Sequence, residues 1–115
     1  ALVWRRKAYE AAEGPATRIR WWASYIEALT RLAPGEVALI RRAAMEVFEP
    51  SAGMDDLFAG ANHRNLQRAR ASLDSWSEQG GTAKVVLDDF DAEVRRLCNA
   101  ETAGSVERAN CGAML

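Results

Sequence analysis

Apolar residues recur at steps of three, four and three positions in four separate segments of this chain. Because an α-helix has about 3.6 residues per turn, residues at these steps lie along one face of a helix, and an apolar face of this kind is normally buried. The four apolar sets are Ile19, Trp22, Ile26 and Leu29; Val37, Ile40, Ala44 and Val47; Leu66, Ala69, Leu73 and Trp76; and Leu87, Phe90, Val94 and Leu97. They predict an all-α fold in which amphipathic helices surround one core.

Glycine and proline interrupt the pattern and so mark where the predicted helices end. The expected helices occupy residues 1–14, 15–32, 36–48, 63–78 and 82–99. In the short N-terminal helix, Trp4, Ala8 and either Ala11 or Ala12 share one side. Residues 100–115 form a C-terminal tail or a short helix. We therefore expect a single domain, a four- to five-helix bundle.

The stretch over residues 51–62 is the least regular part of the chain. Met54, Leu57 and Phe58 are spaced for one helical turn, which would also include Asp55 and Asp56. Gly60 and Asn62 then interrupt this helical turn or cap the next helix, which is expected to start at residue 63.

The length and composition of the chain limit the class of protein to which it can belong. A chain of 115 residues with 49% apolar and 27% charged residues is typical of one soluble globular domain. No run approaches the ~20 apolar residues that a transmembrane helix needs, and the start of the chain shows no cleavable signal pattern. These features favour the cytoplasm, with a periplasmic or secreted location expected if the two cysteines are bridged.

The charge distribution leaves one nucleic-acid hypothesis open. The net charge of −1 gives no overall attraction to nucleic acid. The first twenty residues are nevertheless basic, because five cations outnumber Glu10 and Glu13; the cations are Arg5, Arg6, Lys7, Arg18 and Arg20. A nucleic-acid binder acting through this segment would lose affinity steeply with salt. We favour a solvated basic face.

The two cysteines, Cys98 and Cys111, are a candidate disulfide. They do not form a Cys-x-x-Cys pair and no second ligand cluster accompanies them, which argues against a zinc site. Cys98 ends a predicted helix and Cys111 lies in the tail. A disulfide between them would tie the tail to the bundle in an oxidising compartment, and free thiols are the alternative.

His63 is the only histidine and the only candidate phosphoacceptor. The histidine phosphotransfer (Hpt) domains are helical bundles of about this size with one exposed histidine on a helix, and His63 in its predicted helix resembles that arrangement. Family members carry a lysine and then a glycine shortly after the histidine, where this chain has Leu66 and Gln67. The resemblance implies a sensor or phosphotransfer domain of a bacterial-type signalling protein as an alternative function.

No other pattern predicts catalysis, a metal or a cofactor. Four carboxylates gather at Asp88, Asp89, Asp91 and Glu93, but a di-iron bundle needs Glu-x-x-His pairs and an EF-hand needs a different ligand order. They are expected to form a solvated face near a helix N-terminus. Glycine-rich phosphate loops and nucleophile motifs are missing from the sequence. We predict a non-enzymatic protein without cofactor or metal.

The 15–32 helix carries a second apolar edge beside its core stripe. Trp21 projects about 100° away from Trp22, and Tyr25 and Leu32 continue the same edge. Either the N-terminal helix covers this edge or a protein partner does, since Trp, Tyr and Arg dominate interface hot spots. The sequence thus predicts a protein-interaction module or a small homo-oligomer, with Trp21, Tyr25, Arg18, Arg31 and Leu32 as the candidate contact residues.

Overall fold

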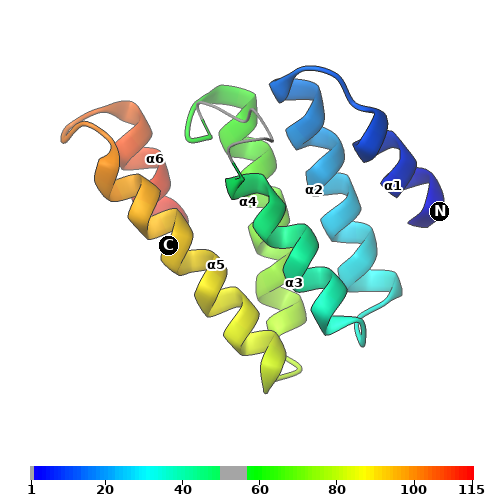
Figure 1. The fold of residues 1–115 in the computed structure, drawn as a ribbon. Helices are drawn as coiled ribbons and strands as arrows, with labels where there is room; N and C mark the ends of the chain where they lie inside the picture. Colours follow the sequence, from blue (N-terminus) through cyan, green and yellow to red (C-terminus); the bar gives the residue numbers. More distant parts are fainter. Residues whose placement is uncertain (1, 50–56) are drawn as a thin grey trace.

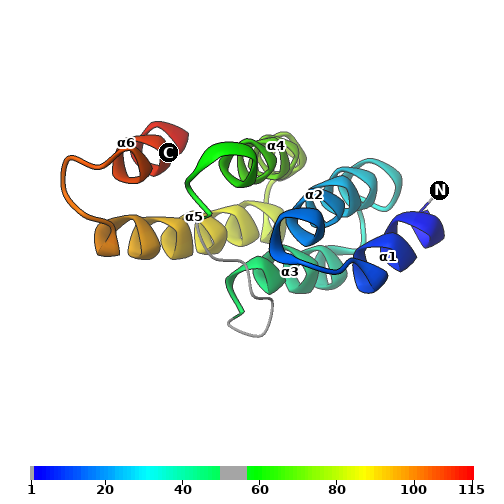
Figure 2. The same ribbon diagram turned by 90° about the horizontal axis from the view of Figure 1, so that it is seen from above.

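The computed structural model describes residues 2–49 and 57–115, which form six α-helices and one short 3-10 helix (Figure 1). The α-helices are α1 (Leu2–Ala11), α2 (Pro15–Leu32), α3 (Val37–Met45), α4 (Gly60–Ser77), α5 (Thr82–Ala100) and α6 (Val106–Met114), and the 3-10 helix η1 (Glu46–Phe48) follows α3. Helices α2, α4 and α6 lie in a row, and α3 and α5 pack across one side of that row (Figure 2). Helix α1 lies beside α2, at the end of the row opposite α6. The predicted all-α bundle is confirmed.

The four apolar stripes form the core, as their spacing predicts. All sixteen side chains are buried except Val37 and Leu97, which are half-buried near helix ends. Trp22 lies at the centre, where its ring stacks near Phe90 at a centroid distance of 6.4 Å. Its indole nitrogen donates a 2.8 Å hydrogen bond to the carbonyl of Ala43, so this buried polar group is satisfied.

The start of α4 differs from the sequence-based expectation. Helix α4 begins at Gly60, three residues early, and the backbone N–H of His63 already donates to the carbonyl of Ala59 at 3.2 Å. Residues 54–56 of the expected helical turn lie outside the described part of the chain. Leu57 and Phe58 lie in a turn and are both buried in the core.

The C-terminal segment forms helix α6, one of the two alternatives for residues 100–115. The Ser105 side chain caps this helix by accepting a 3.1 Å hydrogen bond from the backbone N–H of Arg108. Cys98 of α5 and Cys111 of α6 form a disulfide with their Cα atoms 5.7 Å apart. The Asn110 amide donates a 2.8 Å hydrogen bond to the carbonyl of Phe58. These contacts hold α6 against α5 and the start of α4.

Candidate functional site

Helix α1 covers the middle of the aromatic edge of α2. The rings of Tyr9 and Tyr25 stack at a centroid distance of 6.0 Å. An Nη1 nitrogen of Arg6 donates to the Tyr25 hydroxyl at 2.9 Å, and the Arg5 guanidinium donates to the Ser24 hydroxyl at 3.0 Å. Tyr25 is consequently only 2% exposed. Of the two possibilities for this edge, the structure realises intramolecular packing at Tyr25, which removes that residue from the candidate contact surface.

The other four candidate residues divide into two pairs. Trp21 is half-buried, and the guanidinium of Arg20 lies over its ring at 5.6 Å from the centroid. Arg18 is also half-buried. Arg31 and Leu32 are exposed at the C-terminal end of α2. The structure therefore leaves Arg31 and Leu32 as the exposed members of the predicted surface.

Helix lengths explain why Leu32 is left uncovered. With 10 residues α1 is about 15 Å long, whereas α2 with 18 residues is about 27 Å long. Since a short link joins the two helices as an antiparallel pair, α1 lies beside the first part of α2 (Figure 1). In the described residues, the last turn of α2 extends beyond α1, and Leu32 is 51% exposed there.

The most exposed aromatic side chain of the described residues was not among the candidates. Trp4 is 76% exposed and its neighbour Val3 is 66% exposed. The side of the first helix that carries Trp4 is not its inner face, because Leu2, Arg5 and Tyr9 contact the core or α2 instead. These three residues are spaced by three and four positions, but the arginine among them hid the pattern.

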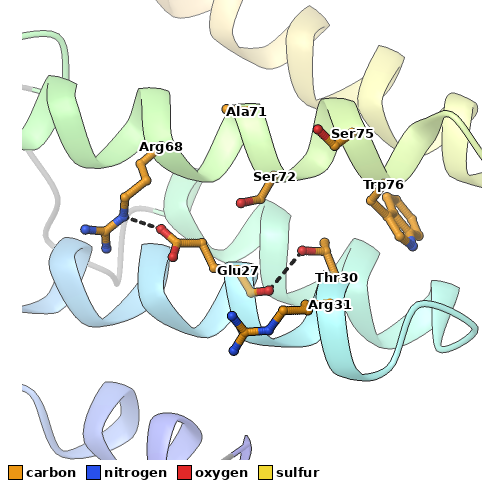
Figure 3. A pocket seen from close by; sticks show the side chains of 8 residues that line it. All are labelled: Glu27, Thr30, Arg31, Arg68, Ala71, Ser72, Ser75 and Trp76. Atoms are coloured by element: carbon orange, nitrogen blue, oxygen red, sulfur yellow. Dashed lines mark hydrogen bonds and ion pairs between the residues drawn. The ribbon is translucent and has the colours of Figure 1, made fainter.

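A shallow groove of about 650 Å³ runs between α2 and α4 (Figure 3). Its lining residues are Glu27, Thr30, Arg31, Arg68, Ala71, Ser72, Ser75 and Trp76. An ion pair between Arg68 and Glu27 crosses one end, and Arg68 also donates to the carbonyl of Arg20 at 3.3 Å. Trp76 closes the other end, where its indole nitrogen donates to the carbonyl of Pro34 at 2.9 Å. The groove is thus bounded by two fixed contacts.

The candidate phosphoacceptor His63 lies at the buried side of α4. The side chain is only 9% exposed, and its Nδ1 has no hydrogen-bond partner among the described residues. Burial, with a smaller contribution from the Arg64 charge, lowers the pKa of His63 below its ordinary value. A phosphodonor needs access to the imidazole, which this placement restricts.

The acidic run of α5 is distributed among four separate cations. Asp91 accepts two 2.8 Å hydrogen bonds from Arg70 of α4, a bidentate pair between two helices. The remaining ion pairs are Asp89 with Arg41, Glu93 with Arg96, and Asp88 with Lys84. Within residues 2–49 and 57–115, no three His, Cys, Asp or Glu side chains gather in an arrangement that could hold a metal ion.

Most of the basic side chains near the N-terminus have intramolecular contacts. Arg5 binds the Ser24 hydroxyl, Arg6 binds Glu10 and the Tyr25 hydroxyl, and Arg20 lies over Trp21. These contacts direct three of the five cations toward the protein's own side chains. Of these three arginines, Arg6 pairs with a carboxylate, that of Glu10, while the other contacts orient the guanidinium groups without cancelling their charge.

Comparison with known proteins adds no identification: no family model, curated protein or solved structure matches this chain significantly. Among the helices of the described residues, none combines the length and apolar character needed to cross a bilayer.

Proposed function

We propose that this chain is a non-enzymatic protein-interaction module that self-associates through the outer edge of the α1–α2 hairpin. The proposed surface, called the hairpin edge below, consists of Val3 and Trp4 of α1 and Arg31 and Leu32 of α2. Arg31 and Leu32 are among the contact residues expected from the sequence. Trp4 takes the place of Trp21 and Tyr25 as the aromatic contact residue.

The exposure of Trp4 carries this proposal. The other three tryptophans are covered: Trp22 and Trp76 are buried, and Trp21 is half-buried under Arg20. Trp4 alone among them presents most of its ring to solvent. Tryptophan and arginine are the side chains most enriched at interface hot spots, because a large rigid ring releases much water when it is covered.

The two alternative functions receive less support from the geometry. Phosphotransfer at His63 requires an accessible imidazole, and this imidazole is buried. Nucleic-acid binding requires free cations along one surface, and Arg5 and Arg6 are hydrogen bonded to α2. The interaction surface needs only side chains that are already exposed.

Light scattering on a size-exclusion column over a wide protein concentration range tests the proposal. We expect a mass that rises above the monomer value of 12.7 kDa with concentration. Trp4→Ala should return the mass to the monomer value without changing the helical circular dichroism signal. Val106→Ala is the matched control, because Val106 is also an exposed apolar residue but lies on α6, and it should behave like the wild type.

A monomer mass at every concentration would contradict self-association. The same hairpin edge would then have to be tested against a different protein chain. A Trp4→Ala variant that associates as strongly as the wild type would place the contact elsewhere on the molecule.

The disulfide between Cys98 and Cys111 supports an oxidising compartment for the module. Disulfides form and persist outside the reducing cytoplasm, so we extend the proposal to a periplasmic or secreted location. Quantifying free thiols in protein isolated from its native source tests this extension: two free thiols per chain would contradict it.

A further inference from the structure

We propose that two copies of the chain pair through the outer face of α1, with the two α1 helices antiparallel about a two-fold axis. This inference rests on the self-association proposed above and specifies how the α1 part of the hairpin edge meets the second copy. Helix α1 lies at the end of the row opposite α6, and its outer side faces away from the other helices (Figure 2).

An apolar stripe runs along the outer face of α1. Trp4, Ala8 and Ala11 are spaced by four and three positions, so they share one side of the helix. Trp4 is 76% exposed, Ala11 is exposed and Ala8 is half-buried, whereas Tyr9 on the inner side is buried. Because the two alanines are small, a second helix can approach this stripe closely beside the Trp4 ring.

A pair of opposite charges lies beside the apolar stripe on the same outer side. Lys7 and Glu10 are three positions apart and therefore neighbours on the helix surface. Lys7 is exposed and forms no ion pair with any residue in the described part of the chain. Glu10 accepts a 2.8 Å contact from Arg6 through its Oε1 atom, and its side chain remains 60% exposed. Both charges are thus accessible to a second copy.

The order of these residues along α1 selects the antiparallel orientation. A parallel two-fold pair would place Lys7 against Lys7 of the second copy, and like charges across an interface weaken association. In the antiparallel pair, Lys7 of each copy meets Glu10 of the other, and the ring of Trp4 lies over Ala11 of the other copy. Each contact occurs twice, because a two-fold interface uses the same patch on both copies.

A single two-fold axis satisfies both contacts. The midpoint between Trp4 and Ala11 and the midpoint between Lys7 and Glu10 both fall within one residue of Ala8. An axis beside Ala8 therefore brings both pairs together at once, with the small Ala8 side chains at the centre of the contact.

The short length of α1 predicts a weak pair. A standard interface buries about 800 Å² on each partner. One face of a ten-residue helix, about 15 Å long, buries less than that. We therefore expect monomers in dilute solution and dimers at high concentration, a regime in which the loss of one charge contact is measurable.

Charge substitutions, with association measured by analytical ultracentrifugation, test the orientation. Lys7→Glu places a carboxylate opposite Glu10 in both halves of the pair, so it should raise the dissociation constant about tenfold. The double variant Lys7→Glu/Glu10→Lys exchanges the two charges and should associate about as tightly as the wild type. Lys84→Glu is the matched control, because it makes the same charge change at an exposed lysine of α5, and it should leave association unchanged.

Cysteine crosslinking tests the position of the axis independently. In the antiparallel pair the two Ala8 residues face each other, whereas the two Ala11 residues lie about 9 Å apart along the helix axis. A disulfide requires Cα atoms within about 7 Å of each other. Ala8→Cys should therefore form a covalent dimer on air oxidation, and Ala11→Cys should not.

Two results would overturn the antiparallel pair while leaving self-association in place. Both apply to a protein whose mass rises with concentration. The first is a Lys7→Glu variant that associates as tightly as the wild type, as a parallel pair predicts. The second is an Ala11→Cys variant that crosslinks as readily as Ala8→Cys. A wild-type mass that stays at the monomer value would overturn both this inference and the self-association on which it rests.

Discussion

Tyr9 and Tyr25 stack on each other where α1 crosses α2, with their ring centroids 6.0 Å apart. Each hydroxyl is also bound: Tyr9 donates to a carboxylate oxygen of Glu46 at 2.9 Å, and Tyr25 accepts from Arg6 at 2.9 Å. The pair therefore joins α1 to α2 through its rings and to η1 through one hydroxyl. Burial and the hydrogen bond to Glu46 raise the pKa of Tyr9 well above its ordinary value.

Truncation of Tyr25 is expected to affect folding and not only association. Tyr25→Ala should lower the free energy of unfolding by about 3 kcal/mol, because it leaves a cavity between α1 and α2. Tyr25→Phe keeps the ring and loses only the hydrogen bond from Arg6, so its cost should stay below about 1 kcal/mol. Urea denaturation measures both. An unfolding free energy of Tyr25→Ala equal to that of the wild type would show that α1 does not cover this residue in solution.

The Arg70–Asp91 pair should stabilise the packing of α4 on α5. Both side chains are mostly buried, at 20% and 15% exposure, and hydrogen bonding to Asp91 raises the pKa of Arg70. Arg70→Gln leaves a largely buried carboxylate without its cation, so we expect a loss of about 2 kcal/mol. Arg96→Gln removes the exposed pair with Glu93 and should cost less than about 0.5 kcal/mol. Equal effects of the two variants in urea denaturation would refute this distinction.

Loss of the disulfide should destabilise the protein and loosen α6 first. The two cysteines are 13 positions apart, and the chain-entropy model assigns about 3 kcal/mol to closing a loop of this size. The double variant Cys98→Ala/Cys111→Ala should lose about that amount, and its amide hydrogens in α6 should exchange faster than those in α2. Dithiothreitol should destabilise the wild type but not the double variant. Unfolding free energies that do not respond to the reductant would count against a bond in solution.

Mild acid should reduce stability through His63. Its folded-state pKa lies below the value near 6.5 of the unfolded chain, because the neutral imidazole is buried. The unfolded state therefore binds more protons, and the free energy of unfolding falls as the pH drops from about 6.5 toward the folded-state pKa. His63→Gln should flatten this dependence between about pH 7.5 and about pH 5.5, a range above most carboxylate titrations. Parallel urea titrations of the two proteins would disprove a contribution from His63 if their pH dependences were the same.

The four core stripes were predictable because every inward position in them is apolar. The orientation of α1 was not, since its inner face includes Arg5, whose guanidinium is satisfied by Ser24 of α2. A pattern based on apolar residues assigns such a position to the surface, and for the same reason it groups Trp4 with the alanines of the helix. The inward orientation of Arg5 becomes evident only from its hydrogen bond to Ser24 on a different helix.

Two other features depended on contacts between distant segments. Helix α6 is held by the disulfide and by the bond from Asn110 to Phe58, so its nine residues carried too weak a local signal to be separated from a tail. The burial of His63 likewise depends on the segments packed beside α4. The groove between α2 and α4 has no sequence signature either, because its lining residues come from two helices.

The central claim is that Trp4, on the hairpin edge, is the residue through which the chain contacts another copy. The four tryptophan indole signals in a two-dimensional ¹H–¹⁵N NMR spectrum, recorded over a dilution series, test it most directly. We predict that the Trp4 signal shifts and broadens as the concentration rises, while those of the buried Trp22 and Trp76 stay constant. A Trp4 signal that does not change with concentration, in a sample whose mass does, would contradict the account.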